Sequence, residues 1–141
     1  MAFKINPTTS KLDYYEPNTN SPSGGLTPMI LDSYKVLGAT SPTLLTTVDL
    51  DVGFTYAFEI TGLSQRGAGS TGSFIKVVRQ FGRTAGGSIA AAPSVSFNSV
   101  SYSVGPSFVL VGNTVEVYAG VAGGIPINWN LELKVYKIEN T

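Results

Sequence analysis

The chain has 141 residues, of which 13% are charged, and its nine basic residues balance nine acidic ones. It contains no cysteine and no histidine, which excludes disulfides, thiol nucleophiles, the usual zinc sites and catalysis by a base that titrates near neutral pH. The balanced charge gives no reason to expect nucleic acid or an anionic membrane as a partner. A chain of this length predicts one domain rather than two.

Residues 1–16 predict a short arm that anchors the protein. Phe3 and Ile5 share one parity, Leu12 and Tyr14 share the other, and turn-forming residues separate the two pairs, which predicts a small hairpin with one apolar face. Because two strands alone are marginal in water, we expect the arm to dock on its own domain or on a partner. A loosely ordered terminus is the alternative. The anchoring residues that we assign are Phe3, Ile5, Leu12, Tyr14 and Tyr15.

Residues 17–28 are rich in Pro, Asn, Ser and Gly, a composition that is typical of a linker. The globular domain is therefore expected to span residues 29–141. The first residues lack the apolar core of a signal peptide, and no run is long and apolar enough to cross a bilayer. We expect synthesis in a cytosol.

Alternating apolar residues predict about eight short strands after the linker. Residues 29–37 predict the first. From 48 to 60 the apolar residues take even positions, and Asp51-Val52-Gly53 divides this run into two strands. Residues 73–82 alternate less and suit a strand covered on both faces, and the glycine-rich residues 84–92 predict a loop or an edge.

Short alternating pieces follow at residues 95–97, 100–104 and 108–111, the last ending in a turn at 112–113. From 114 to 138 the apolar residues occupy odd positions on both sides of Gly123-Gly124. This pattern predicts a β-hairpin whose two apolar rows cover one core. Because helical periodicity is absent, the fold class that we predict is all-β, an antiparallel, jelly-roll-like β-sandwich with an extended N-terminal arm.

A glycine motif at residues 67–72 fits G-x-G-x-x-G. A dinucleotide site needs a helix that opens directly after this motif, because the helix N-terminus holds the pyrophosphate. The residues that follow predict a strand, so a surface loop is the better interpretation.

Three carboxylates are candidates for catalysis or calcium binding. Asp49 and Asp51 lie two positions apart, with Glu59 on the next predicted strand. Such groups can form a glycosidase pair or coordinate calcium, but the spacing lacks the Gly and Glu of an EF-hand loop. We interpret them as solvated strand residues and expect no metal and no cofactor.

Arg66, Arg79 and Arg83 cluster loosely in the sequence. They suit contact with an anionic glycan or an acidic neighbour, or they are ordinary solvated or salt-bridging charges. Trp129 lies on an apolar row and is expected in the core. Tyr118 and Tyr136 lie on the other face, so we assign them, with Arg66, to surface contact with a partner.

Several stretches, taken together, are similar to a known group of proteins. They are residues 53–60, the turn Gln65-Arg66-Gly67, residues 73–77, and residues 113–133 with Ile-Asn-Trp at 127–129. This set resembles a β-sandwich module of tailed-bacteriophage virion proteins, in which a strand ending in Thr-Gly precedes a glycine turn and Ile-Asn-Trp or Ile-Arg-Trp. Here Ala119-Gly120 stands where Thr-Gly is common, and Ile125-Pro126 lengthens the turn. Residues 6–13 likewise resemble the Asn-Pro-x-Thr-Gly-x-Leu-Asp start of many phage structural proteins, with Ser10 in place of Gly.

The resemblance implies a non-enzymatic part of a virion, made in the host cytoplasm. The arm would attach to other head, neck or tail proteins, and the sandwich would assemble with copies of itself, with a trimer as the expected state. The protein would then be a short fibre or a capsid or tail decoration protein. One alternative is a receptor-binding protein that attaches to host-surface glycan through the loops at 64–72 and 84–92. A glycan-degrading enzyme that uses Asp49, Asp51 or Glu59 is a third possibility.

Overall fold

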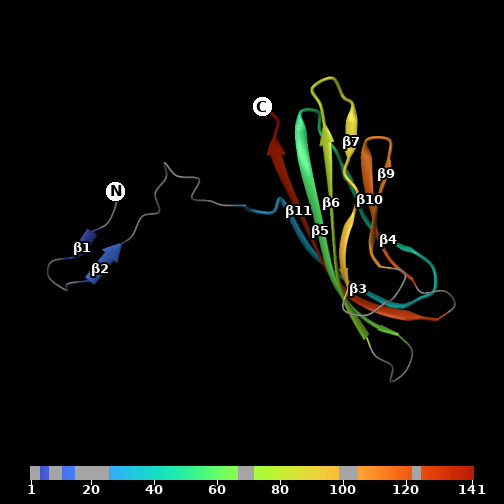
Figure 1. The fold of residues 1–141 in the computed structure, drawn as a ribbon. Coiled ribbons are helices and arrows are strands. Elements are labelled where there is room, and N and C mark those ends of the chain that lie inside the picture. Colours follow the sequence, from blue (N-terminus) through green and yellow to red (C-terminus); the bar gives the residue numbers. More distant parts are fainter. Residues whose placement is uncertain (1–3, 7–10, 15–25, 67–71, 99–104, 122–124) are drawn as a thin grey trace.

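The computed structural model describes residues 4–6, 11–14, 26–66, 72–98, 105–121 and 125–141. These residues form eleven strands and no helix (Figure 1), which confirms the all-β prediction. The strands are β1 (Lys4–Asn6), β2 (Lys11–Tyr14), β3 (Ile30–Ala39), β4 (Thr43–Asp49), β5 (Phe54–Arg66), β6 (Gly72–Arg83), β7 (Ile89–Ala91), β8 (Val95–Asn98), β9 (Ser107–Val111), β10 (Thr114–Ala119) and β11 (Ile127–Glu139).

Strands β3 to β11 make two antiparallel sheets that pack as a sandwich (Figure 1). The six-stranded sheet has the order β3-β11-β5-β6-β7, and β8 also pairs with β6. The three-stranded sheet has the order β4-β10-β9. The nested pairs β3–β11 and β4–β10 are those of a jelly roll, whereas β5–β6 and β9–β10 are plain hairpins. The predicted antiparallel sandwich is confirmed, with nine strands rather than about eight.

The core fills the space between the two sheets because successive side chains on a strand point to opposite faces. Phe58 of β5 is its centre, with its ring centroid 5.5 Å from that of Phe81 and 5.4 Å from that of Phe108 on the opposite sheet. Each of these three rings is at most 2% exposed. The core therefore joins both sheets through aromatic contacts that stabilise beyond their buried area.

The predicted hairpin of residues 114–138 is wrong, because β10 and β11 lie in different sheets. Strand β10 pairs with β4 and β9, and β11 pairs with β3 and β5. The apolar rows still cover one core, but they do so from opposite sides. Alternation shows which residues turn inward and carries no information about which strand is the hydrogen-bonded neighbour. The predicted glycine turn at 123–124 lies outside the described residues.

Other boundaries follow the sequence closely. The run at 48–60 is interrupted as predicted, and Gly53 and Gly112 occupy turns with φ of 85° and 62°, values that favour glycine. Strand β7 is the predicted edge. The prediction that residues 73–82 are covered on both faces is wrong for the single chain, because Phe74 and Lys76 on the outer face are exposed. The predicted piece at 100–104 lies outside the described residues.

Strands β1 and β2 pair antiparallel, with Ile5 opposite Leu12, as the hairpin prediction for the arm requires. Most of the predicted linker, residues 17–25, lies outside the described part of the chain. Within the described ranges, no helix is long and apolar enough to cross a membrane.

The position where the chain changes sheets offers a stability test. The Trp129 indole is 2% exposed, and its Nε1 donates a 2.8 Å hydrogen bond to the Gly120 carbonyl. Trp129→Phe removes this donor and part of a buried ring, so we expect the free energy of unfolding in urea to fall by about 2–4 kcal/mol. Val111→Ala, at a position that is 52% exposed, should change it by less than about 0.5 kcal/mol. Equal losses would contradict the assigned role of the indole.

Candidate functional site

The outer face of the six-stranded sheet carries the most distinctive surface of the described chain. In antiparallel sheets, residues opposite one another share a face, so the registers place the outward side chains in rows across the strands. One row is Lys35, Asn130, Leu63 and Phe74. The next is Ser33, Glu132, Thr61, Lys76 and Phe97. A third is Leu31, Lys134, Glu59, Val78 and Val95.

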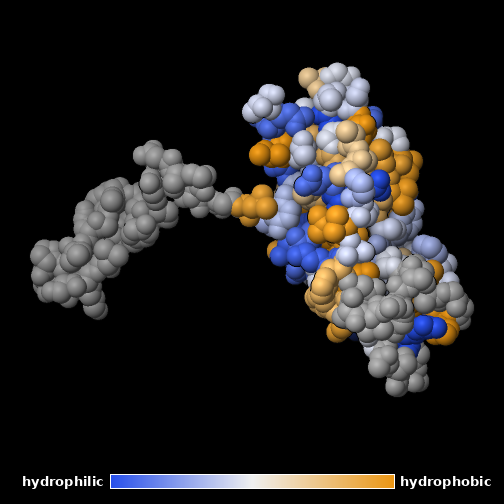
Figure 2. All heavy atoms as spheres, in the orientation of Figure 1, coloured by the Kyte–Doolittle hydropathy of each residue, from blue (hydrophilic) through white to orange (hydrophobic). Residues whose placement is uncertain are grey.

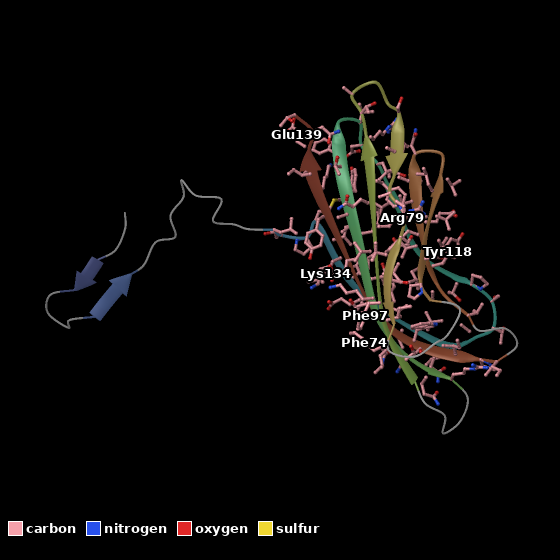
Figure 3. The ribbon with its side chains drawn as sticks, viewed as in Figure 1. Phe74, Arg79, Phe97, Tyr118, Lys134 and Glu139 are labelled. Carbon is pink, nitrogen blue, oxygen red and sulfur yellow. The ribbon has the colours of Figure 1, made fainter. Side chains whose placement is uncertain are left out.

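Across these rows, most of the exposed apolar side chains lie on the β6 and β8 side of the face, and most of the polar side chains lie on β11 and β5. Four exposed residues on β5, β6 and β8 form what we call the apolar ridge: Leu63, Phe74, Val95 and Phe97. Their exposed fractions are 57%, 45%, 69% and 67%. Leu63 is directly opposite Phe74, and the two phenylalanines lie close together in Figure 3. Figure 2 shows hydrophobic residues interrupting the largely polar surface of the sandwich. Phe97 is opposite Lys76, the next outward residue of β6 after Phe74, and Val95 is opposite Val78.

Beside the ridge lies what we call the amide groove, which runs over β11. Two adjoining depressions of about 450 and 460 Å³ share Lys35, Leu63 and Asn130 in their linings. The Asn128 side chain accepts a 2.7 Å hydrogen bond from the Gly38 N–H, which ties the groove to the end of β3. Within the described part of the chain, the side-chain amide of Asn130 makes no hydrogen bond. The groove is shallow and offers amide groups, with apolar walls on either side.

Charges on the outer face pair mostly with each other. Lys76 Nζ lies 3.2 Å from the Glu59 carboxylate, and Lys134 Nζ lies 3.7 Å from that of Glu132. Exposed pairs of this kind contribute little stability. Their effect is to leave the ridge flanked by charges of both signs that compensate each other, so the face carries no strong field.

The residues assigned to surface contact do not converge. Tyr136 is half-buried on the outer face of the large sheet and lines a small depression with Ala57 and Gln80. Tyr118 is on the outer face of the small sheet (Figure 3), where its hydroxyl donates a 2.8 Å hydrogen bond to Glu116. That bond raises the pKa of Tyr118. Arg66 is half-buried at the end of β5, opposite Ile127. These three residues belong to separate surfaces.

Two arginines have a structural role that the sequence did not indicate. Arg79 of β6 donates from Nε to the Ala92 carbonyl at 2.9 Å and from Nη1 to the Phe108 carbonyl of the opposite sheet at 2.8 Å. Arg83 donates from Nη1 to the Leu50 carbonyl at 2.6 Å. Both guanidinium groups are therefore engaged within the chain and are not simply solvated, and contact with a glycan or an acidic neighbour stays a prediction. They link the sheets by satisfying backbone acceptors.

The three carboxylates are not brought together. Asp49 accepts a hydrogen bond from the Thr114 hydroxyl on the outer face of the small sheet, whereas Glu59 is on the outer face of the large one. Sheets in a sandwich are about 10 Å apart, so these outward side chains do not form a glycosidase pair. Asp51 pairs with Lys137 in the turn before β5. Among the described residues, no cluster of three metal-ligating side chains occurs.

The remaining candidates are the glycine motif and the residues of the arm. Strand β6 begins at Gly72, so a strand rather than a helix follows the glycine motif, and the dinucleotide interpretation fails on context. Residues 67–71 lie outside the described part. Of the arm residues, Phe3 and Tyr15 also lie outside it, and Ile5, Leu12 and Tyr14 are placed only as backbone in β1 and β2. Their anchoring role stays a prediction.

Sequence reasoning missed the apolar ridge, although a signal was present. Residues 74–78 are Phe-Ile-Lys-Val-Val, a strand with apolar residues on both parities. We interpreted this as a strand covered on both faces. The core covers Ile75 and Val77, whereas Phe74 on the other face is 45% exposed.

The chain was compared with known proteins. No protein-family model matches the sequence, and no curated protein matches it significantly. Among solved structures, it is similar to the crystal structure of Acinetobacter baumannii phage AM24 tailspike protein, with 9% identity and a TM-score of 0.41 over 79% of this chain. The chain spans 27% of the length of that protein. An identity and a TM-score this low transfer no role to this chain.

The ion pair in the β4–β5 turn gives a pH-dependent prediction. The hydrogen bond from Lys137 to Asp51, 2.6 Å long, lowers the pKa of Asp51 below its ordinary value and raises the pKa of Lys137. The stability that Asp51 contributes is therefore present above its unfolded pKa and is lost as pH falls through its folded pKa. In Lys137→Gln, an NMR titration should show the Asp51 pKa shifted upward, whereas Lys134→Gln should leave it unchanged. An unaltered Asp51 pKa in Lys137→Gln would refute the pairing.

Proposed function

We propose that this protein is a non-enzymatic structural component of a tailed-phage virion, either a short fibre or a decoration protein of head, neck or tail. It assembles with copies of itself and is mounted by its N-terminal arm. The resemblance of residues 113–133 and 6–13 to phage virion proteins supports the class. The all-β sandwich is compatible with it.

The observation that carries the assembly role is the exposed apolar ridge on the six-stranded sheet. Its four residues are between 45% and 69% exposed and lie on the same face of three strands, with Leu63 opposite Phe74, Phe97 opposite Lys76 and Val95 opposite Val78. Contiguous apolar surface of this kind marks interaction sites on soluble proteins. A part of a particle meets this requirement, because its neighbours cover what a single chain leaves in water.

The arm supports mounting on a neighbour. Its two short strands pair with each other, and a hairpin of this size needs a further surface for stability. The linker composition of residues 17–28 gives the arm reach. In this proposal Phe3, Ile5, Leu12, Tyr14 and Tyr15 contact another head, neck or tail protein.

Among the described residues, no contact specifically favours the glycan-binding alternative. The loop at 84–92 uses polar groups internally, since Thr84 accepts a hydrogen bond from the Ser88 N–H and Gly87 N–H donates to the Thr84 carbonyl. The central part of the other loop, residues 67–71, lies outside the described residues. Recognition of host-surface glycan therefore stays a prediction of the sequence.

Light scattering on two forms of the protein tests assembly and separates the arm from the domain. The shortened form starts at Met29 and keeps β3 to β11, which contain both sheets and the whole core. We expect the full chain to have the mass of an oligomer, with a trimer as the sequence-based expectation. Loss of the oligomer in the shortened form would assign assembly to the arm, and retention would assign it to the sandwich. A full chain that is monomeric at all concentrations would contradict the proposed assembly.

A further inference from the structure

We propose that the apolar ridge is the surface by which copies of this chain meet, with each ridge packed against the equivalent ridge of another copy. Leu63, Phe74, Val95 and Phe97 then lie around the symmetry axis of the oligomer. The inference rests on the proposed self-assembly and adds the surface that performs it.

The ridge has the composition and size of an interface centre. A phenylalanine side chain offers about 150–250 Å², so two half-exposed phenylalanines with Leu63 and Val95 present on the order of 400 Å² of apolar surface. Patches of this size on monomers are often functional. Aromatic residues are enriched at interface centres, where they supply most of the binding energy.

The surroundings of the ridge match an interface rim. Glu59, Lys76, Glu132 and Lys134 are paired within the chain, so the same face of two copies can approach without like charges being left uncompensated. Lys35 is the exception within the described ranges, and it lies on β3 at the far side of the amide groove. A strongly charged partner would be recognised by unpaired charges, which this face largely lacks. The near neutrality of the face therefore favours a second copy of itself.

The area is also adequate. Five strands, β3, β11, β5, β6 and β8, contribute to the outer face. Strand β8 has four residues and the other four have ten to thirteen. At about 4.8 Å between strands and about 3.3 Å per residue, this face covers roughly 800 Å². A stable specific interface buries about 800 Å² on each partner. One outer face per copy is enough, with no contribution from the arm.

The same inference explains the pattern of strand β6. Its outer residues Phe74 and Val78 lie on either side of Lys76, on the face opposite the buried Ile75 and Val77, so each face carries two large apolar residues. A strand of this kind is normally covered on both sides. The core covers one side, and in the oligomer the ridge of another copy covers the other.

Phe97→Glu tests the surface in the full chain. Phe97 is 67% exposed on an edge strand, so the variant should fold normally, with an unchanged midpoint of urea unfolding when both proteins are monomeric. Because it places like charges together at the axis, we expect its dissociation constant to rise by about 30-fold or more, measured by analytical ultracentrifugation. The matched control is Val111→Glu on the outer face of the other sheet, 52% exposed in the single chain, which should keep the wild-type oligomer.

A cross-linking experiment tests whether the ridge meets its own equivalent. The chain has no cysteine, so Phe97→Cys carries a single thiol. With a short bis-maleimide, the full-length variant should form a covalent dimer, whereas Val111→Cys should not. Cross-linking at Val111 alone would overturn the proposal.

The outcomes separate this inference from the proposed function. An oligomer that survives Phe97→Glu and does not cross-link at Phe97 overturns the ridge contact and leaves self-assembly through another surface. A wild-type chain that is monomeric overturns both. Loss of the oligomer in Phe97→Glu and Val111→Glu alike would also overturn the ridge contact, because neither surface would then be specific.

Discussion

The crossing of the chain from the small sheet to the large one, between β10 and β11, is the constraint on which the rest of the structure depends. The chain leaves the small sheet after Ala119, and the Trp129 indole bonds back to the Gly120 carbonyl from the large sheet. This bond holds the two sheets where they exchange the chain. The antiparallel ladders with β3 and β5 then set the direction of β11, which lies between these two strands. Every outward residue of β11, including Asn128 and Asn130 of the amide groove, follows from that placement.

Arg79 and Arg83 extend the same connection along β6. A guanidinium that donates to backbone carbonyls of the opposite layer supplies charge-assisted hydrogen bonds where the sandwich opens toward water. The inner face of the large sheet is thereby covered by aromatic packing and by arginine side chains that donate to backbone carbonyls. The outer face lacks such cover at the apolar ridge, whose residues are exposed to solvent. The asymmetry between the two faces of one sheet is the feature that connects the fold to the proposed assembly.

The sequence predicted local features well and long-range ones poorly. Alternation located the strands around Phe58 and Trp129, and glycine located the turns at Gly53 and Gly112, because these depend on neighbours in sequence. Strand partners depend on residues far apart, so the crossing between β10 and β11 was missed. The arginine contacts were missed for the same reason, since Arg79 bonds to Phe108 only once both sheets exist. The ridge could be predicted only in part. Residues 74–78 showed apolar residues on both faces of the strand, but not which face the chain itself would cover.

The central claim is that the outer face of the large sheet is covered in the proposed oligomer. Hydrogen exchange of the full chain, measured at a low and a high protein concentration, tests this claim most directly. Backbone amides at a sheet edge exchange readily when water reaches them. If copies meet at the ridge, amides of β8 should exchange more slowly at the high concentration, while those of β9 on the other sheet should not change. Protection confined to β9, or exchange independent of concentration throughout the sandwich, would contradict the account.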